Sequence, residues 1–381
     1  MNTTPLAALN HIPPHLHTIA DYQKQAQLHL DAATWANLEG AAGDEYSLNN
    51  NLRAFADIQL LPRHLNTFAG ANTQIQLLGE QYPHPIFLAP VAYQQLFHPQ
   101  GEIATAQAAA ALQAPMILSH LSTTSMSTLN QVSGAAKWFQ LYWQGSRKAA
   151  LDLIFQAQHY AYQAIVLTVD APHMGIRDRE RRAAFQLPAH IRAVYQSSVN
   201  TTPLKENQHP LFDGLMQQAA TWEDIAWLLQ HSPLPILLKG ILHPDDAQQA
   251  YQYGAHGIIV SNHGGRILDT AVSPIQILGT MRKILSHDFP ILLDSGIRRG
   301  TDIFKALALG ASAVLVGRPY IYGLAVAGAL GAAHSIKLLK EEFEVTMALM
   351  GTSCIEQINS GYIYHQNSQQ QKNISQHMQY M

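Results

Sequence analysis

Residues 261–269, SNHGGRILD, bring side chains that can transfer a proton and bind an anion into one short segment. His263 is followed by two glycines and by Arg266, and the segment comes directly after the apolar run HGIIV. A histidine can act as a general base near neutral pH when a carboxylate holds its ring in one tautomer. Glycine has no side chain, so it lets a ligand approach the backbone closely. The segment therefore predicts a cofactor lying against Gly264 and Gly265, with His263 moving a proton.

The element that would hold this segment is one of eight short apolar runs. The runs are PIFLAP (85–90), PMILSH (115–120), KWFQLYW (137–143), AIVLTVD (164–170), PILLKG (235–240), GIIVSN (257–262), PILLDS (290–295) and AVLVGR (313–318). Apolar runs without polar alternation are typical of strands buried on both faces, as in a parallel sheet. Alanine-rich amphipathic stretches between them, such as GEIATAQAAAALQA and GTDIFKALALGA, indicate helices.

Eight strand–helix units over about 230 residues predict an α/β fold, the (β/α)8 TIM barrel. An open doubly wound sheet is the alternative, and it fits poorly because no GxGxxG sequence follows the first strand. We expect one domain over residues 1–381, in four parts. These are an N-terminal helical segment (1–84), the barrel (85–356), a long mobile loop after strand four (186–221) and a flexible tail (360–381).

The composition argues against several classes of protein. The 23 basic and 26 acidic residues give a formal charge of −3 with no basic stripe, so nucleic acid is not an expected partner. Cys354 is the one cysteine, which excludes an internal disulfide and a multi-cysteine metal site and suits a reducing compartment. There is no lysine or arginine before Lys24, and the longest apolar stretch, 319–333, is too short to cross a bilayer. We expect a cytoplasmic protein with no membrane insertion and no metal site.

The predicted strands end in residues that would meet at one face of the barrel. In this fold the active site forms at the C-terminal ends of the strands. From the first strand to the eighth, these residues are Pro90, Val91 and Ala92; Ser119; Gln140 and Tyr142; Thr168 and Asp170; Lys239; Ser261 and His263; Asp294 and Arg298; Gly317 and Arg318. Titratable groups at six of the eight ends of otherwise apolar strands indicate a site rather than a purely structural core.

The last two strand ends predict a phosphate site. DSGIRRG and VGRP place glycines and arginines after strands seven and eight, where barrels commonly bind a phosphate. Glycine lets backbone N–H groups approach an anion, and the guanidinium fork matches phosphate oxygens. Ordinary left-handed turns with solvated arginines would explain either segment alone. Both segments together, at these two strands, favour a phosphate-bearing ligand.

Charged residues around His263 indicate how the chemistry could work. Lys239 would point its ammonium group into the barrel mouth, where it needs an anionic partner. That partner is either a cofactor oxygen or, in the alternative interpretation, a salt bridge with Asp294 or Asp170. Asp170, across the barrel from His263, would hold the imidazole in one tautomer and raise its basicity.

Two arginines could bind a carboxylate beside this base. Arg266 lies in the same loop as His263, and Arg177 lies in the segment MGIRDRERR. Together they predict a clamp for a carboxylate substrate next to the atom that loses a proton. For Arg177 a charged, solvent-facing turn is the alternative interpretation. Asp269 has no assigned chemistry, and we expect it only to order the loop.

From about residue 35 to residue 356, the chain resembles the FMN-dependent 2-hydroxy acid oxidases and dehydrogenases, the family of glycolate oxidase, lactate oxidase and mandelate dehydrogenase. The resemblance rests on LAPVAYQQLFHPQGE, WFQLYW, LTVDAP, LLKGIL, SNHGGRILD, DSGIRRGTDIFKALALGA and VGRP. APVAYQQLFHPQGE and FQLYW look most like hydroxymandelate oxidase. The resemblance implies an FMN cofactor, oxidation of an (S)-2-hydroxy acid to a 2-oxo acid, and reoxidation of the flavin by oxygen, which forms hydrogen peroxide, or by another acceptor.

Matched position by position, the resemblance implies a role for each candidate residue. His263 would be the base and Asp170 its partner, and Tyr142, Arg177 and Arg266 would bind the substrate. The flavin ring would be held by Pro90, Val91, Ala92, Ser119, Gln140, Thr168, Lys239 and Ser261. The ribityl chain and phosphate would be held by Asp294, Ser295, Gly296, Ile297, Arg298, Gly317 and Arg318. Lys239 would also stabilise the reduced, anionic ring.

Three positions bear on substrate and acceptor. Asn37 stands where many family members have a substrate-contacting tyrosine, and Leu121 where glycolate oxidase-like members have a tryptophan. Both changes remove an aromatic group from the expected pocket, which favours a larger or aromatic 2-hydroxy acid. Ala92 favours an oxidase, because glycine is commoner there among the membrane dehydrogenases.

Other functions remain open at the level of sequence. One alternative is an L-lactate dehydrogenase-type enzyme that passes electrons to an acceptor other than oxygen. A second is a different reaction on an FMN barrel, which the intact set of Arg177, His263 and Arg266 argues against. A third is a flavin-binding barrel whose chemistry has lapsed, which Asn37 makes conceivable. By analogy with the family, we expect a homotetramer or octamer.

Overall fold

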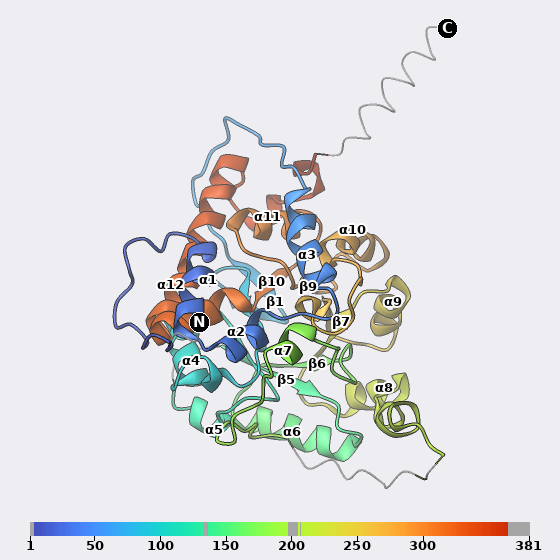
Figure 1. Ribbon diagram of the computed structural model, residues 1–381. Coiled ribbons are helices and arrows are strands. Elements are labelled where there is room, and N and C mark those ends of the chain that lie inside the picture. Colours follow the sequence, from blue (N-terminus) through green and yellow to red (C-terminus); the bar gives the residue numbers. More distant parts are fainter. Residues whose placement is uncertain (1–3, 133, 135, 197–204, 206, 365–381) are drawn as a thin grey trace, which may run out of the picture.

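The computed structural model describes residues 4–364 except 133, 135, 197–204 and 206 (Figure 1). Eight parallel strands close into a barrel in the order β10-β3-β4-β5-β6-β7-β8-β9. They are β3 (Ile86–Leu88), β4 (Met116–Leu118), β5 (Lys137–Tyr142), β6 (Ala164–Thr168), β7 (Ile236–Ile241), β8 (Gly257–Val260), β9 (Ile291–Leu293) and β10 (Ala313–Val316). Each strand overlaps one of the eight apolar runs, so the predicted (β/α)8 TIM barrel is confirmed.

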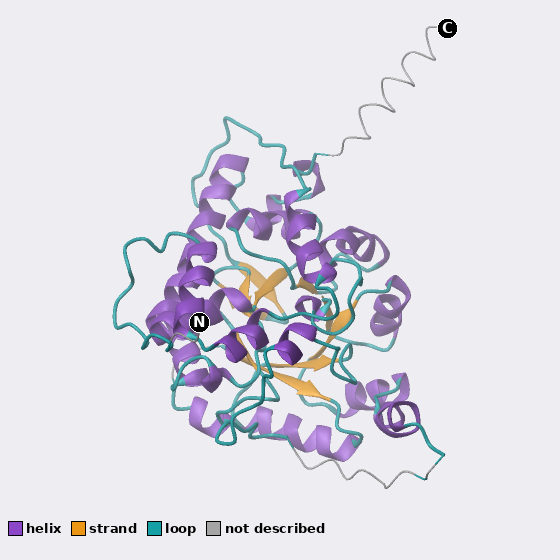
Figure 2. Cartoon of the chain, in the orientation of Figure 1, coloured by secondary structure: helices purple, strands orange, loops and turns teal. Residues whose placement is uncertain are grey.

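Helices surround the strands on the outside of the barrel (Figure 2). Those that follow β3 in the chain are α4 (Gly101–Leu112), α5 (Met126–Leu129), α6 (Arg147–His159), α7 (Asp178–Arg182), α8 (Trp222–His231), α9 (Pro244–Gln252), α10 (Pro274–Ile284), α11 (Gly300–Ala308) and α12 (Arg318–Met350). Local sequence sets several of their starts. Thr221 and Asp224 form a capping box at α8, and α9 and α10 begin at proline, whose missing N–H needs no partner there.

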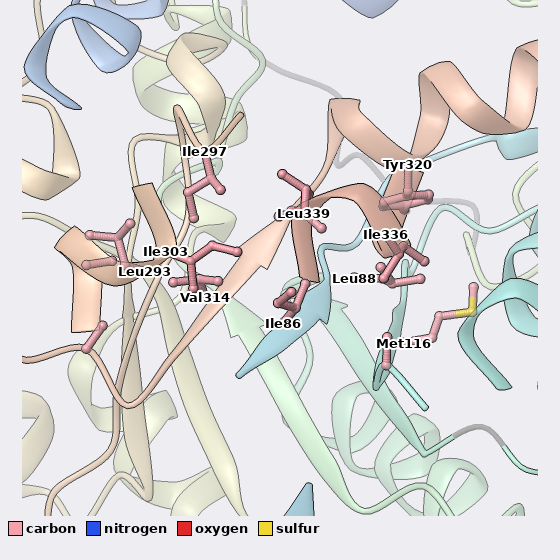
Figure 3. Packing of buried hydrophobic residues seen from close by; sticks show 14 of the residues in the cluster. Ile86, Leu88, Met116, Leu293, Ile297, Ile303, Val314, Tyr320, Ile336 and Leu339 are labelled. Atoms are coloured by element: carbon pink, nitrogen blue, oxygen red, sulfur yellow. The ribbon is translucent and has the colours of Figure 1, made fainter. Parts of the chain in front are cut away.

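The strands bury side chains in two apolar layers, because successive residues point to opposite faces. Inside the barrel, Phe87 and Trp138 are fully buried, with ring centroids 5.0 Å apart. Outside it, Ile86 and Leu88 belong to a second cluster that includes Ile336 of α12 (Figure 3). Since both layers exclude water, the strands need apolar residues at every position, which explains the unbroken apolar runs.

A two-stranded antiparallel hairpin, β1 (Ile75–Leu77) and β2 (Glu80–Tyr82), packs its apolar side chains against the interior layer. Leu78 and Gly79 connect the strands with positive φ values of 52° and 83°, as a two-residue hairpin turn requires. The prediction of a helical segment up to residue 84 missed this hairpin. Strands of three residues are too short for a periodic pattern to be recognised.

The predicted N-terminal helical extension is present as α1 (Ile19–His29), α2 (Ala32–Glu39) and α3 (Tyr46–Ala56). Helix α3 is joined to the barrel by a buried pair of amides. Asn51 Nδ2 donates to Asn262 Oδ1 at 2.9 Å, and Asn262 Nδ2 donates to Asn51 Oδ1 at 2.7 Å. Because Asn262 directly precedes His263, this pair places α3 beside the candidate base.

Helix α12 is, among the described residues, the one helix long and apolar enough to cross a membrane by length and composition. Of its most apolar window, 67% is buried inside the protein. Its backbone also bends at Ala327 and Gly328, where the φ of Gly328 is 54°. Across the bend, Gly323 packs so closely on Gly331 that a Cβ on Gly323 would lie 2.2 Å from the Gly331 carbonyl oxygen. The helix therefore packs as a bent core element.

The polar insertion and the C-terminal tail are described in part. Residues 197–204 and 206 of the predicted mobile loop, and 365–381 of the predicted flexible tail, lie outside the described residues. The predicted start of the flexible tail, residue 360, is too early. Tyr362 is buried with its ring 5.7 Å from that of Phe304, and Ile363 pairs with Leu60.

Candidate active site

A cavity of about 750 Å³ opens at the C-terminal ends of the barrel strands. Its size is in the range of small-molecule and cofactor sites. Of the predicted site residues, those that line it are Pro90, Val91, Ala92, Ser119, Gln140, Tyr142, Thr168, Arg177, Lys239, His263, Arg266, Asp294, Ser295, Gly296, Ile297, Arg298, Gly317 and Arg318. The remaining two, Asp170 and Ser261, lie behind the wall and are hydrogen-bonded to His263 and Lys239.

His263 presents one ring nitrogen to a carboxylate and the other to the cavity wall. Its Nδ1 lies 3.0 Å from Asp170 Oδ1, and its Nε2 lies 3.4 Å from the Tyr142 hydroxyl. A hydrogen bond from Nδ1–H to the carboxylate leaves Nε2 free to accept a proton. Gly240 makes room for this pair, since a Cβ there would lie 2.4 Å from the Asp170 side chain. This arrangement suits a general base.

Asp170 keeps its negative charge in this buried position. Burial alone would raise the pKa of its carboxyl group. The charge and hydrogen bond of His263, with a contribution from Lys239, more than offset this and hold the pKa below its usual value. The ionised carboxylate can therefore stabilise an imidazolium on His263 when the ring takes up a proton.

The two adjacent glycines after His263 have different surroundings. Gly264 lines the cavity, as predicted for a residue next to a cofactor. Gly265 faces α3 instead, where a Cβ would lie 2.7 Å from the Leu48 nitrogen. The prediction that both glycines make room for a cofactor is therefore wrong for Gly265, which permits close packing of the N-terminal segment.

The ammonium group of Lys239 lies in the cavity wall with 4% of the side chain exposed. It is 3.0 Å from Asp294 Oδ2 and donates to Ser261 Oγ at 2.9 Å. Burial alone would lower its pKa, but Asp294 and Asp170 raise the pKa above its usual value. The salt bridge considered from the sequence is thus present. It does not remove Lys239 from the cavity, so a permanent positive charge is available there.

Three buried polar side chains continue this wall. Ser119 Oγ donates to Gln140 Oε1 at 3.3 Å, and Gln140 Nε2 donates to Thr168 Oγ1 at 3.0 Å. Two arginines, Arg298 and Arg318, line the part of the cavity formed after β9 and β10. A flavin ring carries carbonyl and nitrogen acceptors, and its ribityl chain ends in a phosphate. The polar row and the cationic end therefore fit FMN.

Arg177 and Arg266 converge on one carboxylate, that of Glu180. Arg177 Nη1 lies 2.9 Å and Arg266 Nη2 3.1 Å from Glu180 Oε1. The Arg177 side chain is only 10% exposed, so the alternative interpretation of a solvent-facing turn is wrong for this residue. The sequence analysis missed Glu180. Within RDRERR its only signal was the spacing of three residues from Arg177, and the arginines that follow, such as Arg182, are exposed.

Arg266 also connects the site to the end of α2. Its Nη1 donates to the carbonyl oxygens of Asn37 and Gly40, both at 2.7 Å. Asn37 and Leu121, the two positions where the sequence departs from the family pattern, both line the cavity. Both residues are therefore within reach of a ligand in the cavity.

Asp269 ties its loop to the start of α3. Its carboxylate accepts hydrogen bonds from the backbone N–H of Asp44 at 2.9 Å and of Ser47 at 2.8 Å. Gly43 leaves space for this contact, since a Cβ there would lie 2.9 Å from Asp269 Oδ2. Among the described residues these contacts agree with the expectation that Asp269 orders the loop.

His120 is a further buried residue of the cavity wall that the sequence analysis did not single out. Its Nδ1 accepts a hydrogen bond from the Tyr142 N–H at 3.2 Å, and its Nε2 lies 3.1 Å from the Tyr195 carbonyl oxygen. Burial lowers its pKa to about 4, although the contact with Tyr195 acts in the opposite direction. The neutral ring therefore joins the end of β5 to the described part of the polar insertion.

A barrel with a polar wall, a cationic end and a histidine–carboxylate pair facing two arginines defines an oxidoreductase that binds a phosphorylated cofactor and a carboxylate substrate. The family model described as FMN-dependent dehydrogenase matches residues 26–365. The chain belongs to this family. It is an FMN-dependent oxidoreductase of 2-hydroxy acids that acts on CH–OH donors, with FMN as its cofactor.

Named relatives agree with this assignment. The chain is 46% identical to an L-lactate oxidase of Roseobacter sp. (strain GAI101), over 90% of this chain and 93% of that protein. It is 40% identical to a 4-hydroxymandelate oxidase of Amycolatopsis orientalis, over 89% and 95% of the two chains. A crystal structure of mandelate oxidase with (S)-2-phenylpropionate superposes with a TM-score of 0.82 at 40% identity, covering 89% of this chain and 96% of that one.

Replacing the base should separate cofactor binding from chemistry. His263→Asn should retain FMN, because the ring pocket is unchanged. It should slow anaerobic reduction of the flavin by substrate by roughly 10²–10⁴-fold. Stopped-flow absorbance would measure this rate. His287→Asn, at a fully exposed histidine, is the matched control and should behave as the wild type. Reduction of His263→Asn at the wild-type rate would contradict the assigned role.

The buried His120 should make the protein less stable in mild acid. Its pKa is about 4 when folded and 6.5 in the reference state. The unfolded chain therefore binds more protons between these values, and stability falls as the pH falls. From pH 7 to pH 5 this contribution is about 2 kcal/mol. Urea unfolding of wild type and His120→Gln at both pH values measures it. An equal pH dependence in the two proteins would contradict the prediction.

Proposed function

We propose that this protein is an (S)-2-hydroxy acid oxidase that uses molecular oxygen as acceptor and acts on acids with an apolar side chain, from L-lactate upward. The observation that carries the proposal is the placement of His263, backed by Asp170, beside Arg177 and Arg266 in one cavity. A base next to two cationic groups suits an acid whose hydroxyl-bearing carbon is adjacent to a carboxylate.

In this proposal each residue has one task. Arg177 and Arg266 bind the substrate carboxylate through charge-assisted hydrogen bonds and so fix the position of C2. His263 Nε2 accepts a proton from the substrate, and Asp170 stabilises the resulting imidazolium. Tyr142, whose hydroxyl is 3.4 Å from His263 Nε2, can hydrogen-bond an oxygen of the substrate. FMN, when bound, takes up the two electrons that leave the substrate.

The cavity wall supports an apolar substituent on C2. Leu121, Trp143, Met174, Phe185 and Leu187 line the cavity. Apolar surface of this kind stabilises a methyl or larger group by about 25 cal/mol per Å² removed from water. Glycolate has no such group. The names of the relatives, L-lactate oxidase and 4-hydroxymandelate oxidase, support the same range of substrates.

A substrate panel tests the proposal. Purified protein should show bound flavin, and under anaerobic conditions L-lactate, L-2-hydroxyisocaproate and (S)-mandelate should each bleach it faster than glycolate. Admitting air should restore the oxidised spectrum and form one hydrogen peroxide per turnover. If the oxidised flavin spectrum returns slowly in air but quickly with an artificial quinone, the alternative of a non-oxygen acceptor is favoured. Flavin that no acid bleaches would favour lapsed chemistry and contradict the proposal.

We also propose that the protein is a cytoplasmic homotetramer. Its single cysteine suits a reducing compartment. Three large apolar side chains near the cavity mouth, Met174, Ile176 and Leu268, are 63%, 57% and 68% exposed. Exposed apolar groups gathered on neighbouring loops are typical of a contact between subunits. Light scattering should give about four times the 42.0 kDa chain mass, and a monomeric mass would contradict this part of the proposal.

A further inference from the structure

We propose that Glu180 is a positioning residue for substrate binding: it holds Arg177 and Arg266 in the orientation in which both can bind the substrate carboxylate. The inference rests on the proposed function, because it takes the two arginines as the carboxylate-binding groups. The roles proposed for His263, Arg177 and Arg266 do not by themselves require Glu180, so Glu180 is an additional functional residue.

The contacts of Glu180 make it the junction between two loops. Its Oε1 accepts from Arg177 Nη1 at 2.9 Å, after β6, and from Arg266 Nη2 at 3.1 Å, after β8. The side chain is 13% exposed and lines the cavity. Arg177 Nε donates in turn to the Arg266 carbonyl oxygen at 3.3 Å. One carboxylate oxygen therefore sets the position of one guanidinium relative to the other.

The donors of Arg266 show what remains for a ligand. A guanidinium has five N–H donors. Two at Nη1 bind the carbonyl oxygens of Asn37 and Gly40, and one at Nη2 binds Glu180. With these three engaged by described residues, two donors are left for a substrate carboxylate. Without Glu180, only the two Nη1 hydrogen bonds would hold the guanidinium group of Arg266, and its plane would be free to rotate about them.

Charge in this region makes the carboxylate necessary. Burial, with the neighbouring charges of Arg177 and Arg318, lowers the pKa of Arg266 to about 9, while Glu180 and Tyr142 act in the opposite direction. A guanidinium keeps its proton in proteins. Repulsion among the three partly buried guanidinium groups of Arg177, Arg266 and Arg318 would therefore displace a side chain rather than remove a proton. Glu180 is the carboxylate that hydrogen-bonds two of them, so its charge opposes that movement.

The test uses the holoenzyme and two variants. Glu180→Gln removes the charge at constant shape, and Glu180→Asp keeps the charge on a shorter side chain. Asp178→Asn is the matched control, because Asp178 lies on the same helix α7 and its ion pairs are with the exposed Arg181 and Arg182. Two sets of measurements are made on each protein. One is the Kd of oxalate, a dicarboxylate that is not oxidised, from its effect on the bound-flavin spectrum. The other is the pair KM and kcat for L-lactate.

We expect Glu180→Gln to raise both the oxalate Kd and KM by about tenfold or more, as for loss of charge-assisted hydrogen bonds, with a much smaller change in kcat. Glu180→Asp should lie between this variant and the wild type, and Asp178→Asn should match the wild type. Flavin content and circular dichroism show whether Glu180→Gln folds. If it does not fold, Glu180→Asp is compared with the wild type instead.

Equal or tighter oxalate binding by Glu180→Gln would overturn the inference, because Glu180 would then act only as an anion competing with the substrate. A fall in kcat at unchanged KM would also overturn it. Failure of the proposed function is a separate result. In that case the wild type would not be reduced by any 2-hydroxy acid, while the oxalate titration would still report whether the arginine pair binds a carboxylate.

Discussion

The partly buried guanidinium of Arg266 joins the three parts of the molecule that form the site. Its loop belongs to the barrel, its Nη1 binds the carbonyl oxygens at the C-terminal end of α2, and its Nη2 binds Glu180 after β6. The end of a helix carries partial negative charge on its unpaired carbonyls, so it suits a buried cation. Arg318 contacts the same helix end through the Leu38 carbonyl oxygen at 2.9 Å. The N-terminal segment is therefore part of the site as well as a cover for the barrel.

The barrel supplies a rigid frame for these charges by separating apolar and polar chemistry along each strand. The strand interiors fill two apolar layers, represented by Phe87 inside and Ile86 outside. Polar side chains lie toward the ends of the strands, and each forms a hydrogen bond or an ion pair with a side chain from another strand. The pairs are Gln140 with Thr168, Lys239 with Asp294, and His263 with Asp170. Each pair links neighbouring strands or strands one apart in the barrel order, so the side-by-side packing of β5 to β9 brings these groups together.

Much of the fold and of the candidate site followed from the sequence. Strands buried on both faces must be apolar throughout, so the runs identified all eight, and barrel geometry then brought their ends together. The predicted residues from Pro90 to Arg318 line the cavity or lie directly behind it. Three features were not predicted: the short hairpin β1–β2, the bridging role of Glu180, and the burial of His120. The hairpin strands are too short to show a period, and the contacts of Glu180 with Arg266 and of His120 with Tyr195 join residues distant in sequence.

The sequence by itself determined which chemistry is available: a base, cations for a carboxylate and a phosphate, and glycines for close approach. It could do so because residue type and strand position follow from local composition. Only the tertiary structure decided which contact each group makes. It assigned Gly264 to the cavity and Gly265 to α3, and it placed Arg177 in the wall rather than in solvent. Distances and burial arise when the barrel closes and α2 and α3 pack on it, so no single stretch of sequence contains them.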